Sequence, residues 1–135
     1  MASRADQDLS ECLLKSFKVV TAAAVRGRLC KLGANDNEIT ICAAGEQGIG
    51  IFISDAPVGA WTTVAMLSGG GVVPVVVGTG GATRNSYAVA VANGLTNQVL
   101  GGGTVVRHIA GVFTQTGVAG DMVGLQIEAF GGVSA

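Results

Sequence analysis

The chain has 135 residues, which is enough for one domain with a buried core. Hydrophobic residues make up 49% of it, aromatic residues 4% and charged residues 13%. The net charge is −1 and the Lys and Arg residues do not cluster, which argues against nucleic acid as a ligand because phosphate binding requires a concentrated basic surface. The longest apolar runs, 72–77 and 87–92, are far shorter than the ~20 residues that cross a bilayer.

The low content of charge has two explanations. A free monomer normally has a well-charged surface, so this composition indicates a surface that is partly covered by other protein. Alternatively, the 22 glycines and the many alanines simply dilute the charge. The three cysteines, Cys12, Cys30 and Cys42, have no C-x-x-C spacing, which favours reduced thiols in a protein that folds inside a cell and argues against a zinc site.

Short alternating segments separated by Gly, Asn, Asp and Pro run along the chain and predict strands. Pro74 cannot donate a hydrogen bond to a neighbouring strand, so its segment is predicted near the edge of a sheet. Residues 88–92 are also compatible with one or two turns of helix. The segments predicted as strands are, in chain order, 17–21, 28–32, 38–42, 48–53, 61–67, 72–77, 86–92, 104–108, 109–113 and 122–128.

The pattern of the last hairpin, 109–128, occurs twice. Residues 50–66 overlay residues 111–127 at one fixed offset of about sixty residues, which indicates two similar halves that each bury what the other exposes. Trp61 in the first copy takes the place of Met122 in the second. The fold prediction is therefore all-β: a compact β-barrel or β-sandwich with two similar hairpin halves, an N-terminal arm and at most one short helix.

The first sixteen residues differ from the rest, since they are polar, charged and without Gly. Asp8 or Ser10 would cap a short helix over 11–15. The segment is interpreted either as an arm that orders against a partner or as an ordinary frayed terminus. The chain is accordingly divided into an N-terminal arm (1–16), a β-barrel or β-sandwich body (17–130) and a C-terminal tail (131–135).

No residue pattern predicts catalysis, a cofactor or a metal. The glycine clusters 69–71 and 101–103 lead into strand-like segments rather than the helix N-terminus that a phosphate loop needs, and 78–84 lacks the Lys-Ser/Thr of a nucleotide site. The only histidine, His108, has no G-x-S-x-G segment with which to form a hydrolase triad. Asp6 and Asp8 are too few to hold a cation.

Three motifs follow one another in a familiar order: TAAAVRGRL at 21–29, EQGIGI at 46–51 and VAGDMVGL at 118–125. In this order and spacing, over about residues 18–128, the chain resembles the decoration, or head cement, proteins of tailed-bacteriophage capsids. The resemblance implies a non-enzymatic virion protein, made in the host cytoplasm, that binds the capsid exterior as a homotrimer and bridges subunits of the major capsid protein. It implies no cofactor, small-molecule substrate, nucleic acid or membrane as partner.

Two other classes of function stay open: another phage structural subunit, such as a tail tube or head–tail connector, and a small β-barrel ligand-binding module. A hydrolase that uses His108 ranks last. Trp61 is interpreted either as the closure of one end of the core, which is slightly preferred, or as an anchor in a subunit interface. The candidate contact residues are Arg4, Asp6, Asp8, Leu13, Leu14, Phe17 and Trp61.

Overall fold

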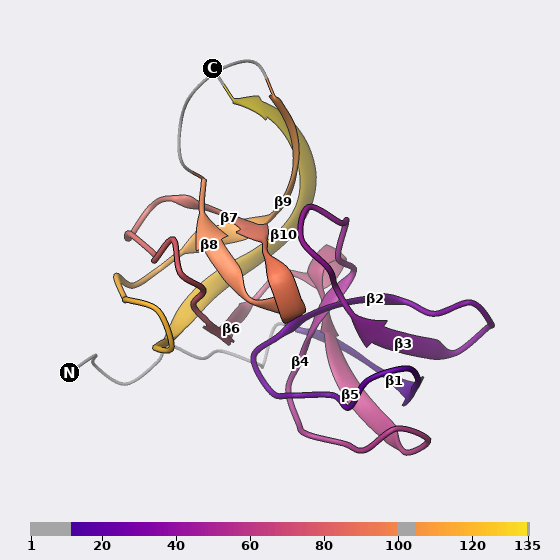
Figure 1. Ribbon diagram of the computed structural model, residues 1–135. Coiled ribbons are helices and arrows are strands. Elements are labelled where there is room, and N and C mark those ends of the chain that lie inside the picture. Colours follow the sequence, from indigo (N-terminus) through magenta and orange to yellow (C-terminus); the bar gives the residue numbers. More distant parts are fainter. Residues whose placement is uncertain (1–11, 100–104, 135) are drawn as a thin grey trace.

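The computed structural model describes residues 12–99 and 105–134, with side chains described for 12–99 and 108–128, and it confirms the all-β prediction (Figure 1). The described residues contain no α-helix, only two single 3-10 turns, η2 (Leu67–Gly69) and η3 (Ala92–Gly94). The strands are β1 (Leu13–Val19), β2 (Leu29–Leu32), β3 (Glu38–Ile41), β4 (Gly50–Phe52), β5 (Trp61–Met66), β6 (Val72–Val76), β7 (Tyr87–Ala90), β8 (Thr96–Gln98), β9 (Val105–Phe113) and β10 (Met122–Ser134).

The first half of the chain forms a closed barrel with the strand order β1-β3-β2-β4-β5. It closes because β1 pairs with β5 on one side and, in parallel, with β3 on the other. Alternation along each strand fills the interior: in β1, Phe17 and Val19 are buried while Lys18 between them is exposed. The side chains of this core are Phe17, Val19, Ala24, Cys30, Ile39, Phe52 and Val64.

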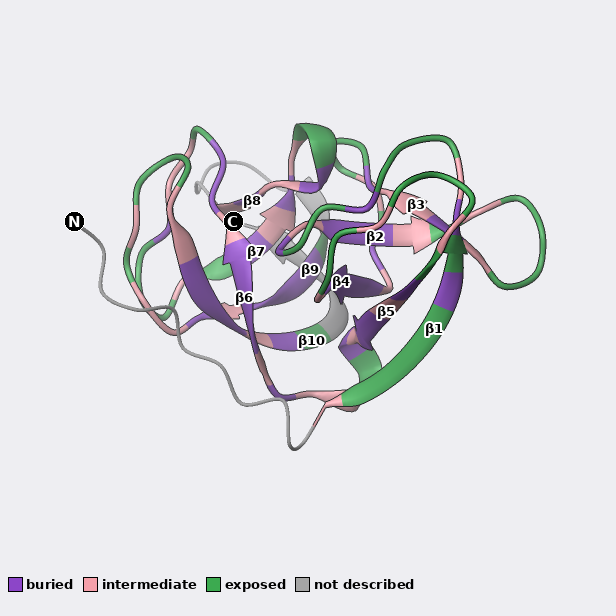
Figure 2. Ribbon diagram, turned by 90° about the horizontal axis from the view of Figure 1, so that it is seen from below, coloured by how far each residue is buried: buried purple, intermediate pink, exposed green. Residues whose placement is uncertain are grey.

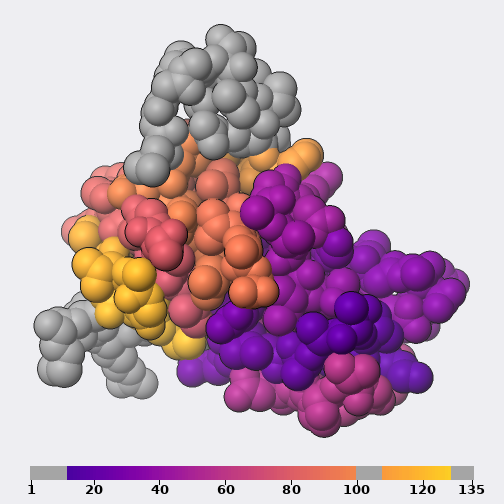
Figure 3. Space-filling model, in the orientation of Figure 1, coloured from indigo at the N-terminus to yellow at the C-terminus, as the bar shows by residue number. Residues whose placement is uncertain are grey.

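The second half forms a five-stranded sheet in the order β6-β10-β9-β7-β8. Its two outer strands approach each other at a single parallel bridge between Val77 and Thr96. The strand with Pro74 is at the edge of this sheet, as predicted, and pairs only with β10. The core of this half is continuous with side chains on the outer face of the first barrel, including Leu29 and Ile51, so the two halves lie side by side in one body (Figure 3).

The two hairpins β4–β5 and β9–β10 have the same register. In both, the phenylalanine near the end of the first arm pairs with the fourth residue of the second strand, and the two residues before it pair with the next two. The pairs are Phe52 with Val64, Ile51 with Ala65 and Gly50 with Met66 in the first hairpin, and Phe113 with Leu125, Val112 with Gln126 and Gly111 with Ile127 in the second. The duplicated hairpin that the sequence predicts is therefore present in the backbone.

The repetition extends to every strand. The five strands β6 to β10 correspond, in chain order, to β1 to β5. Read around the sheet from β6 through β8, the second order is β6-β8-β7-β9-β10, which matches β1-β3-β2-β4-β5 strand for strand. The pairing of Lys18 with Trp61 between β1 and β5 is equivalent to that of Val76 with Met122 between β6 and β10. In the same way, the pairing of Leu29 with Ile51 between β2 and β4 is equivalent to that of Tyr87 with Val112 between β7 and β9. The chain is thus a tandem repeat of one barrel-like unit, of which the sequence pattern reveals only the hairpin.

Turns outside the hairpins repeat as well. The Arg26 amide donates to Asp55 Oδ1 at 2.7 Å, and the equivalent Arg84 amide donates to Thr116 Oγ1 at 3.1 Å. The next residue in each turn has a positive φ, which is 85° at Gly27 and 72° at Asn85. Asn is among the few residues with a side chain that tolerate this conformation, so the turn keeps its shape although its sequence changes.

The structure differs from the sequence predictions at both ends and in the middle. β1 begins at Leu13 and pairs with β5 along its length, so the helix predicted over 11–15 is wrong for residues 13–15. The segment 88–92 is a strand and part of a 3-10 turn rather than a helix. β8 was not predicted, because Thr96–Gln98 is polar and too short for an alternating pattern. β10 continues through 131–134, where the sequence predicts a tail.

Candidate interaction surface

The described residues hold no group of His, Cys, Asp and Glu that would bind a metal ion. Of the glycines at 69–71, the first ends the 3-10 turn η2 and the other two lead into β6, and those at 78–81 connect β6 to β7, so neither cluster precedes a helix. His108 is an exposed residue of β9. Within the same residues there is also no helix of the length and apolarity that a membrane span requires.

Two of the three thiols, those of Cys30 and Cys42, are buried packing groups in two different cores. Cys30 lies inside the first barrel, where its Sγ donates to the Gly50 carbonyl oxygen at 3.2 Å, whereas Cys42 belongs to the core shared by the two halves. Burial raises the pKa of the Cys30 thiol well above its usual value. Burial, followed by repulsion from the Glu46 carboxylate, raises the pKa of Cys42 to about 11. Such thiols stay protonated at neutral pH and are poor nucleophiles.

The predicted contact residues divide into three groups. Arg4, Asp6 and Asp8 lie outside the described residues. Leu13 and Leu14 are 50% and 43% exposed on β1 and are accessible to a partner. Phe17 is only 5% exposed, because its position in β1 points into the first barrel, and it is a core residue there.

Trp61 is 59% exposed, so the preferred interpretation as a closure of the core is wrong. The reason is the alternation of β5, in which Thr62 and Val64 are buried and Trp61 takes the opposite face. It pairs with Lys18 of β1, which is also exposed. The other large apolar side chains that are exposed are Leu13, Leu14, Val25, Leu32, Val58, Tyr87 and Val118. In Figure 2 exposed residues cover much of β1 and the loops around the first barrel.

Charged side chains contribute few fixed contacts. Lys31 Nζ forms an ion pair with Glu46 Oε2 at 2.5 Å, and this hydrogen bond, followed by one from the Ala43 amide, lowers the pKa of Glu46. Both partners are solvent-accessible, so this pair contributes little to stability. An open depression of about 480 Å³ lies beside the same strand, between Lys31 and Glu38. It is an open feature of the surface rather than an enclosed site. The interiors of the two units are filled by side chains that include Phe52 in the first and Phe113 in the second, both 0% exposed.

No protein-family model matches the chain, and no curated protein matches its sequence. Among solved structures, it is similar to the N base of the head fiber protein gp8.5 of bacteriophage phi29. The TM-score is 0.66 at 18% sequence identity, and the match covers 86% of this chain and 93% of that one. The two chains share a fold. Because the match covers far more than half of this chain, the similarity includes both repeated units and their arrangement.

Proposed function

We propose that this chain is a structural subunit of a phage virion, a decoration or cement protein that binds the exterior of the head and bridges neighbouring major capsid subunits. The observation that carries the proposal is the shared two-unit fold with the base of a phage head fiber. The proposal further includes self-association as a homotrimer and no enzymatic activity.

The exposed apolar side chains and the stiffness of the sheets support a role in binding other proteins. Apolar side chains, among them Leu13, Leu14 and Trp61, are exposed on the first barrel, and the chain as a whole has few charges. Strands linked by main-chain hydrogen bonds form both halves, which gives a stiff body that loses little conformational freedom when it binds. Several weak contacts on one rigid oligomer add up to high avidity without a deep pocket.

The two competing functions make different demands. A ligand-binding barrel would need space inside, but the interiors are occupied by Phe52 and Phe113. A tail-tube or connector subunit would place the same stiff body elsewhere in the particle. The location in the virion therefore distinguishes this class from the decoration protein.

The test is co-sedimentation of the purified chain with separated heads and tails of its phage, with heads depleted of the chain beforehand. We expect saturable binding to heads and none to tails, and greater resistance of the loaded heads to heat or to removal of divalent ions. Binding to tails alone, or to neither, would refute the decoration role.

A matched pair of variants tests which surface meets the head. The double variant Leu13→Ser/Leu14→Ser removes two exposed apolar side chains from β1, and Val118→Ser removes one from the turn between β9 and β10. We expect at least a tenfold loss of affinity for heads in the first variant and little change in the second. Thermal unfolding of both variants checks that the fold is kept.

A further inference from the structure

The contact between the two repeated units is asymmetric. A turn face on the first unit, made of Gly27, Arg28 and Leu29, lies on a strand face of the second unit, made of Val76, Met122 and Gly94. The Val76 amide donates to the Gly27 carbonyl oxygen at 2.9 Å, and Arg28 Nη1 donates to the Asn93 carbonyl oxygen at 3.1 Å. The two faces therefore meet through one bond between main chains and one from a side chain to the main chain.

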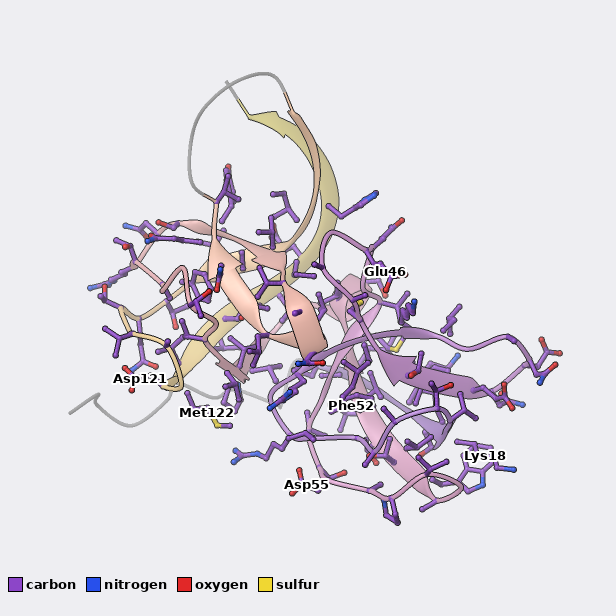
Figure 4. All side chains as sticks on the ribbon, in the orientation of Figure 1. Lys18, Glu46, Phe52, Asp55, Asp121 and Met122 are labelled. Atoms are coloured by element: carbon purple, nitrogen blue, oxygen red, sulfur yellow. The ribbon has the colours of Figure 1, made fainter. Side chains whose placement is uncertain are left out.

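The packing at this contact is close. A Cβ atom added to Gly27 would lie 3.0 Å from Met122 Cε, and one added to Gly94 would lie 2.6 Å from the Leu29 carbonyl oxygen. Leu29 is only 1% exposed. In Figure 4, Met122 lies at the border with the first unit.

Each unit carries both kinds of face, because the units are repeats. The turn face of the second unit consists of Asn85, Ser86 and Tyr87, at the positions of Gly27, Arg28 and Leu29. Tyr87 is 52% exposed and Asn85 is exposed too, whereas their equivalents in the first unit lie in the contact.

The strand face of the first unit consists of Lys18, Trp61 and Asn37, at the positions of Val76, Met122 and Gly94. All three residues are exposed, and Asn37 keeps the positive φ of Gly94, at 63° against 70°. The intramolecular contact thus uses one face of each kind and leaves one of each kind exposed.

The two exposed faces lie far apart on the molecule. Lys18 lies on the side of the first barrel that is remote from the second unit (Figure 4). The strand β7, which carries Tyr87, is separated from β1 in the views of both Figure 1 and Figure 2. One chain cannot bring its own two faces together, but two chains can.

We propose that the turn face around Tyr87 of one copy binds the strand face around Trp61 of another copy, at the place that corresponds to the contact between the two units within a chain. Such a contact is heterologous, because each copy contributes a different face, and it closes into a ring when the rotation between copies permits. In a trimer of this kind the second unit of each chain would contact the first unit of the next chain through these two faces. The inference rests on the proposed self-association and not on binding to the head.

The contact within the chain cannot be copied in detail. Asn85 and Asn37 place side chains where Gly27 and Gly94 allow the two faces to approach closely, so two copies must lie farther apart at these points than the two units do. The Lys18 amide, equivalent to that of Val76, already donates to the Asn37 carbonyl oxygen at 2.7 Å, and Ser86 replaces the long Arg28 side chain. The contact between copies must therefore depend on the two aromatic side chains, which replace Leu29 and Met122. Tyr and Trp are the residues that most often dominate the energy of protein interfaces.

The test uses two variants that each destroy one face, Trp61→Asp and Tyr87→Asp, with Val118→Asp as a control at an exposed apolar residue outside both faces. Mass is measured by analytical ultracentrifugation over a range of concentrations. We expect the wild type and Val118→Asp to form the same oligomer and each face variant alone to be a monomer of 13.4 kDa. An equimolar mixture of the two face variants should form a complex of two chains, because one intact face of each kind remains.

Three results would overturn the inference: a monomeric wild type, a loss of assembly in only one of the two face variants, or a mixture that stays monomeric. An interface that pairs Trp61 with Trp61 would appear as the second of these, since Tyr87→Asp would still assemble. Circular dichroism checks that each variant is folded. If an aspartate impairs folding, the experiment is repeated with the single variants Trp61→Ser and Tyr87→Ser. A monomer that nevertheless binds heads would refute this contact and leave the decoration role standing. An oligomer that assembles as expected but does not bind heads would support this contact and refute the decoration role.

Discussion

Among the glycines whose surroundings the structure describes, Gly111 is the one where an added methyl group would meet the closest obstruction. A Cβ atom there would overlap the carbonyl oxygen of Gln126 and would lie 3.0 Å from the carbonyl carbon of the same residue and 3.1 Å from Ile127 Cα. These atoms are the backbone of the paired strand β10, so no side-chain rotation relieves the overlap. The φ of Gly111 is also +156°, a conformation that residues with a side chain rarely adopt.

The expected cost of Gly111→Ala is the sum of two effects. Backbone strain at a positive φ costs about 1–2 kcal/mol, and overpacking of a filled site costs about 1–3 kcal/mol. We therefore expect the free energy of unfolding to fall by about 3 kcal/mol, which corresponds to a decrease in Tm of roughly 10 °C for a domain of this size. Urea unfolding followed by circular dichroism measures the first quantity and a thermal scan the second.

Gly120→Ala is the matched control. Gly120 has a φ of +87°, but a Cβ atom there would meet nothing within 4 Å. It should therefore cost only the strain, about 1–2 kcal/mol. If Gly111→Ala proved no more destabilising than Gly120→Ala, the close approach of β9 and β10 at this point would be refuted.

Three further predictions concern the core, the thiols and the tryptophan. Phe113→Ala should lower the free energy of unfolding by about 3–5 kcal/mol with an unchanged urea m-value, because the ring is fully buried; a cost under about 1 kcal/mol would show that this core is not packed as described. The folded-state pKa of Cys42, about 11 against an ordinary 9.0, predicts stability that is complete below pH ~9 and declines as the pH rises through 11; urea titrations of wild type and Cys42→Ala over that range should show a smaller decline in the variant, and equal declines would contradict the burial of the thiol. The emission of Trp61 should be that of a hydrated indole in dilute solution and should shift to shorter wavelength as the protein is concentrated; a blue, quencher-resistant emission at every concentration would contradict its exposure.

The sequence alone predicted the fold class and much of the strand pattern, because alternation is a local property. Period-two alternation identified the strands around Ile39, Phe52 and Leu125, and the lack of a basic cluster and of catalytic motifs directed the interpretation toward a structural protein. The repeated hairpin could be seen because both copies keep a Gly-x-Phe segment at the end of the first arm, 50–52 and 111–113, and a glycine in the turn, Gly59 and Gly120. The rest of the repeat could not be seen, since equivalent positions such as Leu29 and Tyr87 or Trp61 and Met122 share a backbone register but not a residue type.

Only the tertiary structure decided which of two equivalent faces is covered. Leu29 and Tyr87 occupy the same place in their units, yet Leu29 is buried against the second unit and Tyr87 is half exposed. Alternation tells which side chains share a face of a strand, but it contains no information on whether that face meets another layer, because the covering residues come from distant parts of the chain. The parallel pairing of β1 with β3, which closes the first barrel, is non-local in the same way. The sequence therefore determined the strands and their faces, and the packing of one repeat on the other determined which faces remain for a partner.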